Sequence, residues 1–207
     1  MKTKKCFEAI ESLASVTRYS DYRLANDESV LEHTGFVGMM ALFIGEHLME
    51  HGADVNMGKL LSRALMHDID EHATGDIAMP VKYHSPELRK LLADMEIMAV
   101  KKLCTDAEIE SSYYHWHEAK SDREGSIVAL CDCLAVLYKI HDEVVRRGNR
   151  SVGDIADNLN TALHFKMMAC STAFEFEDDV RRDDSPFQGM YRDCMKMIDA
   201  IKSRGIA

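Results

Sequence analysis

The 207-residue sequence predicts an all-α fold, on the strength of three observations. Apolar residues recur at spacings of three and four along most of the chain, which is the period of an amphipathic helix. No segment alternates apolar and polar residues between turn residues, as a half-buried strand does. The composition, with 46% hydrophobic and 29% charged residues and only 3 prolines, is typical of a globular helical chain. We therefore expect a single helical domain over residues 1–207.

Capping and proline signals place the expected helices in order along the chain. A short first helix carries the apolar residues between Cys6 and Ala14. Seven later helices are expected to begin at N-capping side chains, some with a capping-box partner or a following proline. These starts are Ser29 with Glu32, Asn56, Ser85 with Pro86, Thr105 with Glu108, Asp122, Ser151, and Ser185 with Pro186. Glycines are expected to end three of these helices, at Gly52, Gly75 and Gly148.

Charge and cysteine usage restrict the kind of partner. The net charge of -10 argues against binding to a nucleic acid duplex, which needs clustered lysine and arginine. An anionic ligand would instead need a bound cation or a few local basic side chains. The six cysteines include no C-x-x-C pair and are expected to be reduced thiols. The sequence also contains no signal peptide and no membrane-spanning apolar stretch, so we expect a cytoplasmic protein.

An imidazole and two carboxylates are close together in the segment from His67 to Glu71. If the third helix continues to Gly75, His67 and Glu71 share a face, and Asp68 lies at the edge of that face. These three side chains would then point into one cleft. In isolation, a His-Asp pair is more often a surface dipeptide on a solvated helix end.

Two further polar residues interrupt apolar helix faces. His33 falls between Val30 and Val37 on the stripe of the second helix, where a single histidine is usually a satisfied core residue. Asp132 is the one charged residue in an apolar run of the sixth helix, and a carboxylate is rarely buried there unless it is paired or binds a metal. The alternative for Asp132 is a buried salt bridge to an arginine. Together with His67 and Asp68, these residues form a ligand set that suits a transition metal with open coordination positions.

The order His33, His67-Asp68, Asp132 resembles the H…HD…D signature of HD-domain phosphohydrolases. Arg18 and the segments 28–34 and 67–83 are similar to the bacterial 5'-deoxynucleotidase branch, which carries E-x-V-x-E-H-S and H-D-x-x-E-x-x-T-G-D-x-x-x-P-V-K-Y. The spacing matches without a gap, and the resemblance covers about residues 15–140. It implies an HD-domain helical bundle, and we expect the C-terminal helices of residues 151–207, which have no motif to compare, to pack on this motif-bearing core.

The resemblance also implies a role for each matched residue. A divalent cation such as Co, Mn, Zn or Mg would be held by His33, His67, Asp68 and Asp132. Glu71 would position and deprotonate the attacking water, and Asp76 would help to orient the nucleophile and the leaving group. Arg18 and Lys82 would contact the phosphate. Tyr19 stands where the family usually has tryptophan in the wall of the nucleotide pocket, which leaves the choice of substrate open.

The resemblance therefore predicts a small-molecule deoxynucleotide as substrate, with hydrolysis of a deoxyribonucleoside 5'-monophosphate as the leading hypothesis. The nearest alternative is a deoxynucleoside triphosphate triphosphohydrolase, such as the small phage enzymes on this scaffold. A non-catalytic metal or nucleotide sensor would be expected to lack a ligand or Glu71, and an unrelated helical interaction module would bind no transition metal. Related enzymes form homo-oligomers, and we expect the same here.

Overall fold

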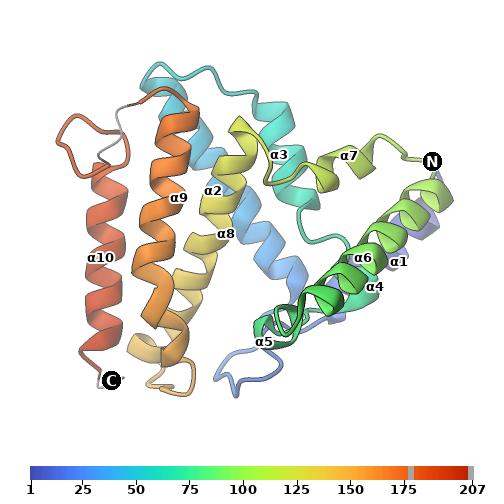
Figure 1. The fold of residues 1–207 in the computed structure, drawn as a ribbon, viewed down its shortest axis with the longest axis horizontal. Coiled ribbons are helices and arrows are strands. Elements are labelled where there is room, and N and C mark those ends of the chain that lie inside the picture. The colour runs from blue at the N-terminus through green and yellow to red at the C-terminus, as the bar shows by residue number, and fades with distance from the viewer. Residues whose placement is uncertain (177–179, 205–207) are drawn as a thin grey trace.

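The computed structural model describes residues 1–176 and 180–204, and it contains helices but no strand within those residues (Figure 1). The elements are α1 (Thr3–Ser15), α2 (Val30–Glu50), α3 (Met57–Met66), α4 (Glu71–Thr74), α5 (Met79–Lys82), α6 (Pro86–Ala107), α7 (Ser112–His117), α8 (Arg123–His141), the π-helical turn η1 (Asp142–Arg146), the 3₁₀-helix η2 (Gly153–Asn158), α9 (Leu159–Ala173) and α10 (Gln188–Lys202). The prediction of an all-α fold is confirmed.

The helices bury two separate hydrophobic clusters. The first, which we call the main core, joins α2, α3, α8, α9 and α10, and its fully buried side chains include Val37, Leu60, Ile127, Leu163 and Ile198. In Figure 1, α9 and α10 stand side by side at one edge of this bundle. The C-terminal helices therefore contribute directly to the main core.

The second cluster, which we call the side core, is smaller and lies around α1 and α6, which run together on the other side of the molecule (Figure 1). Its buried members are Ala9, Leu13, Val30, Ile69, Val100, Leu103 and Cys104. Two of them lie next to main-core residues in the chain: Val30 begins α2, and Ile69 follows α3 by three residues. The two cores therefore meet at these two places in the chain.

Four of the predicted helix starts carry the expected caps. The Ser29 hydroxyl accepts a hydrogen bond from the Glu32 amide, and the Glu32 carboxylate accepts one from the Ser29 amide at 2.8 Å, which completes a capping box. The side chains of Asn56, Ser85 and Asp122 cap α3, α6 and α8, and each accepts one hydrogen bond from a backbone amide of the first turn. These starts are confirmed, and they fix the direction in which α2, α3 and α8 enter the bundle.

The prediction of one continuous third helix to Gly75 is wrong. Helix α3 ends at Met66, and α4 begins only at Glu71. Between them the backbone forms i to i+3 hydrogen bonds, among them Ile69 N–H to Met66 O and Glu71 N–H to Asp68 O, which wind the chain more tightly than an α-helix. The i, i+4 geometry expected for His67 and Glu71 therefore does not apply.

The prediction of a helix that starts at Thr105 is also wrong. Thr105 lies inside α6, which continues to Ala107, and Glu108 adopts φ +59°, the left-handed conformation that ends a helix. The next helix, α7, begins at Ser112. Thr105 and Glu108 have the spacing of a capping box, but they lie at the C-terminal end of α6, where Cys104 and Ala107 are buried.

No helix within residues 1–176 and 180–204 is long and apolar enough to cross a bilayer.

Candidate active site

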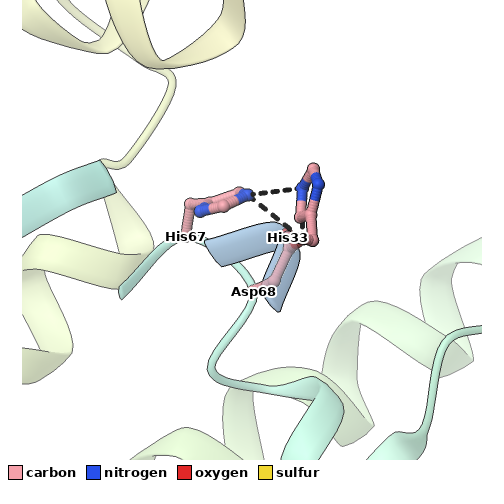
Figure 2. Close-up of side chains that lie close together, drawn as sticks. All are labelled: His33, His67 and Asp68. Carbon is pink, nitrogen blue, oxygen red and sulfur yellow. Dashed lines mark hydrogen bonds and ion pairs between the residues drawn. The ribbon is translucent and has the colours of Figure 1, made fainter. Parts of the chain in front are cut away.

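Three predicted metal ligands lie together where the main core and the side core meet. Nε2 of His33, Nε2 of His67 and Oδ2 of Asp68 all lie within 4.8 Å of one another (Figure 2). The distances are 3.3 Å between the two imidazole nitrogens, 3.4 Å from His33 to Asp68 and 3.1 Å from His67 to Asp68. Ligand atoms that bind one cation at bond lengths near 2.0–2.2 Å are themselves roughly 3–3.5 Å apart. The spacing of these three side chains fits a metal ion.

The packing of the two cores explains why these side chains converge. His33 lies on α2 between Val30 of the side core and Val37 of the main core. The His67–Asp68 pair follows Ala64 of the main core and precedes Ile69 of the side core. In each segment, buried core residues therefore lie both before and after the predicted ligand. The His33 side chain itself is buried, with an exposed fraction of only 1%.

A backbone hydrogen bond fixes the orientation of His67. Its Nδ1 lies 2.7 Å from the carbonyl oxygen of Ala64, which can only accept, so Nδ1 carries the proton and donates. Nε2 is then left with a lone pair that faces His33 and Asp68 (Figure 2). Metal-binding histidines are commonly oriented by a hydrogen bond of this kind.

The chemistry of the donors also favours a cation. Nε2 of His33 faces three acceptors, on His67, Asp68 and Asp132, and one N–H group cannot satisfy all of them. Burial lowers the pKa of His33, but its hydrogen bonds to Asp132, Asp68 and Glu28 outweigh that effect and raise the pKa to about 10. Burial likewise opposes ionisation of Asp68, yet the neighbouring imidazoles hold its pKa well below the usual range. The cluster thus binds positive charge strongly.

The fourth predicted ligand, Asp132, lies beside this group. Its Oδ1 is 3.3 Å from Nε2 of His33, but Asp132 is not part of the set whose ligand atoms all lie within 4.8 Å of one another. Its Oδ2 forms an ion pair with the ammonium group of Lys120. The carboxylate is 25% exposed, so it projects from the apolar face of α8 towards the cluster. The salt bridge considered for Asp132 exists, but within the described residues its partner is a lysine rather than an arginine.

Glu71 begins α4, directly after the turn that carries His67 and Asp68. Its Oε2 is buried and has no hydrogen-bond partner among the described residues. Burial, together with the charges of Asp68 and Asp76, raises the pKa of Glu71 to about 9. A carboxylate that is buried, unpaired and strongly basic is the kind of group that enzymes use in proton transfer.

A loop before α2 brings Arg18 and Tyr19 to the same region. The Arg18 amide donates a hydrogen bond to the Glu28 carbonyl oxygen at 2.8 Å, and the Tyr19 amide donates one to Oδ2 of Asp76 at 3.0 Å. Tyr19 has φ +56°, and the Arg18 guanidinium lies 5.3 Å from the centre of its ring. The same guanidinium is 4.0 Å from the Glu28 carboxylate. Arg18, Tyr19 and Asp76 are therefore assembled as one unit next to Glu28, which in turn lies 3.6 Å from Nδ1 of His33.

Lys82 is in α5 and is half-buried. Its ammonium group lies 3.0 Å from the carboxylate of Glu96 on α6, and this ion pair outweighs the effect of burial and raises the pKa of Lys82. Its charge is therefore already balanced by a carboxylate in the structure.

Two residues beside the cluster were not predicted from the sequence. Glu28 belongs to the matched E-x-V-x-E-H segment, so this motif could have identified it as a residue of the site. Lys120 lies in the connection between α7 and α8 and had no such signal, because only the folded chain brings it to Asp132. Burial lowers the pKa of Lys120, but the charges of Asp132 and Asp68 raise it further, so the ammonium group stays protonated.

Comparison with known proteins identifies relatives of most of the chain. The model of the 5'-deoxynucleotidase YfbR-like family matches residues 5–178. The 5'-deoxynucleotidase YfbR of Escherichia coli is 29% identical over 154 residues, which are 72% of this chain and 77% of that protein. Its namesake from Shigella dysenteriae is 26% identical over 198 residues, 90% of this chain and 100% of the relative.

Solved structures share the fold. An HD-domain phosphohydrolase from Listeria innocua superposes with a TM-score of 0.71 at 26% identity, over 99% of this chain and 100% of that one. The HD phosphohydrolase DatZ of cyanophage S-2L, bound to dA and one catalytic Zn²⁺ ion, gives a TM-score of 0.61 at 16% identity over 96% of this chain and 99% of that chain. The predicted HD-domain fold is thus confirmed, and because the family model covers most of its length, the chain belongs to the 5'-deoxynucleotidase YfbR-like family.

Proposed function

We propose that this protein hydrolyses deoxyribonucleoside 5'-monophosphates to deoxynucleoside and phosphate, and that the reaction depends on a divalent metal ion. The observation that carries the proposal is the convergence of His33, His67 and Asp68 immediately before Glu71. A set of metal ligands next to an unpaired, basic carboxylate is what metal-assisted hydrolysis requires. Family membership and the names of the curated relatives support the choice of a 5'-monophosphate.

The cation would be held by His33, His67, Asp68 and Asp132, and the histidines favour a transition metal such as Co, Mn or Zn over Mg. When bound, a divalent ion lowers the pKa of water and neutralises phosphate oxygens. Oδ1 of Asp132, which lies 3.3 Å from Nε2 of His33, is the oxygen of this carboxylate that would bind the cation.

Proton transfer is assigned to Glu71. A cation bound beside Asp68 would lower the pKa of Glu71 and so leave its carboxylate ionised, and the buried Oε2 would take the proton from the attacking water as the new phosphorus–oxygen bond forms. The bond from phosphorus to the 5'-oxygen would then break, that oxygen would receive a proton from solvent as the deoxynucleoside leaves, and Glu71 would release its own proton to solvent. Asp76 is fixed by the Tyr19 amide and would help to orient the reacting groups. Arg18 and Lys82 are proposed to contact the phosphate, and the Tyr19 ring to line the nucleotide pocket.

The test begins with protein stripped of metal by a chelator and reloaded separately with Co, Mn, Zn or Mg. Each form is incubated with dAMP, AMP and dATP, and the products are separated by chromatography. Release of phosphate from dAMP, with little from AMP, is the expected result. Release of triphosphate from dATP would replace the proposal with the triphosphohydrolase alternative. No turnover of any nucleotide by a metal-loaded protein would favour the non-catalytic sensor.

A further inference from the structure

We propose that Lys120 and Lys166 form a phosphate-binding subsite on the α8–α9 side of the metal site. The inference deepens the proposed function, on which it rests. The two lysines line a cavity of about 130 Å³ together with Ala129, Asp132, Cys133 and Val136. Pockets for whole small molecules usually measure ~300–1,000 Å³, so this cavity suits a phosphate group rather than a complete nucleotide.

Asp132 connects the cavity to the metal ligands. One of its carboxylate oxygens faces Nε2 of His33, and the other is paired with the Lys120 ammonium. Only the carboxylate of Asp132 therefore separates a group held by Lys120 in this cavity from the proposed cation site. That proximity is what the reaction needs, because the phosphorus must lie next to both the metal and the attacking water.

The balance of charge distinguishes these lysines from the other basic residues near the site. The guanidinium of Arg18 lies against Glu28, and the ammonium of Lys82 lies against Glu96. A divalent cation on Asp68 and Asp132 would cancel the charges of those two carboxylates, which leaves the charge of Lys120 without an opposing group. Lys166 forms no ion pair with any carboxylate in the described part of the chain and is exposed. Two uncompensated positive charges match a phosphate dianion.

The donors of Lys120 are also sufficient. An ammonium group has three N–H donors, and Asp132 accepts one of them. The remaining donors are available for phosphate oxygens, and the side chain is 39% exposed, so the group is accessible. Lys120 would thus support Asp132 and contact the phosphate at the same time.

The test uses full-length, metal-loaded protein and inorganic phosphate as the probe. Phosphate affinity is measured by titration calorimetry, metal content by elemental analysis, and kcat and KM with dAMP. The variants are Lys120→Ala, Lys120→Arg and Lys166→Ala, and the control is Lys202→Ala, which removes one exposed charge at the end of α10. Lys120→Ala should weaken phosphate binding by about 10- to 100-fold, the effect of losing a hydrogen bond between charged groups. Lys166→Ala should weaken it less, Lys120→Arg should recover part of the affinity, and Lys202→Ala should change nothing.

Each contrary result has a distinct meaning. If Lys120→Ala and Lys166→Ala bind phosphate as tightly as the wild type, or if the wild type binds none, the subsite is refuted even when dAMP is hydrolysed. If the loss of affinity in Lys120→Ala follows a loss of metal, Lys120 acts only through Asp132, and the inference is wrong. If the lysine variants lose phosphate binding with metal retained but the wild type turns over no nucleotide, the subsite stands and the proposed function fails.

Discussion

Replacement of Glu71 by glutamine separates catalysis from stability. The substitution keeps the size of the side chain and removes its ability to take a proton. Because a general base contributes typically ~10² to 10⁴ in rate, kcat should fall by that factor while metal content and nucleotide affinity remain near those of the wild type. The buried Oε2 makes no hydrogen bond among the described residues that glutamine would disrupt.

The same substitution should stabilise the metal-free protein. The pKa of Glu71 rises from 4.5 to about 9 on folding, so at neutral pH the unfolded chain loses this proton more readily than the folded one. The group therefore lowers stability increasingly as pH rises from 4.5 towards 9. At pH 7 the cost is at most about 3 kcal/mol, since one pKa unit corresponds to ~1.4 kcal/mol. Glu71→Gln should recover that amount and flatten the decline of stability between pH 5 and pH 9.

The assay combines urea unfolding of metal-free protein at several pH values with elemental analysis and steady-state kinetics of the metal-loaded form. Glu50→Gln, at the exposed end of α2, is the matched control. Loss of metal from Glu71→Gln as complete as that from His67→Ala would identify Glu71 as a ligand, and Asp76 would become the next candidate for the base. Lower stability in the metal-free state would refute the electrostatic argument.

Further predictions concern the metal, the connection between α7 and α8 that carries Lys120, and the oligomer. Metal binding at pH 7 should release a proton from His33, whose pKa is about 10 without metal, so metal retention and activity should fall together as the pH is lowered or a chelator is added. Asp132→Ala should lose metal and activity, and calorimetric unfolding at pH 7 should show a less stable metal-free fold, because the buried His33 imidazolium loses the carboxylate that contributes most to raising its pKa. Gly125→Ala should cost about 1–3 kcal/mol in urea unfolding and weaken phosphate binding, because an added Cβ would lie 2.8 Å from the Lys120 carbonyl carbon. The expected homo-oligomer remains a prediction; Met98 is 70% exposed on α6, and Met98→Glu should reduce the mass measured by light scattering if that helix forms the interface.

Four helix starts and the candidate metal ligands could be predicted from the sequence because the signals that mark them are local. Capping side chains act within three residues, so Ser29, Asn56, Ser85 and Asp122 were recognisable without tertiary information. His33 was recognisable because a polar side chain interrupts an apolar face, which the structure buries at 1% exposure. Such patterns can be recognised in the sequence without any knowledge of the fold.

The errors came from interactions that span the chain. The helix expected to continue to Gly75 ends at Met66, because the chain must move from the main core at Ala64 to the side core at Ile69. Periodicity cannot reveal that change, since apolar residues continue on both sides of it. Lys120 was missed for a related reason: an exposed lysine in a short connection carries no pattern, and its partner is 12 residues away on the next helix.

The division into two cores accounts for the position of the site. A polar cluster inside either core would displace apolar packing, whereas at their junction His33, His67 and Asp68 replace only the contact between the two. Each candidate ligand nevertheless lies between buried residues of its own segment, Val30 and Val37 on one segment and Ala64 and Ile69 on the other. The turn from residue 67 to residue 70, which breaks the predicted helix, is therefore also the feature that turns His67 and Asp68 towards α2 and leaves Glu71 to begin the next helix beside them.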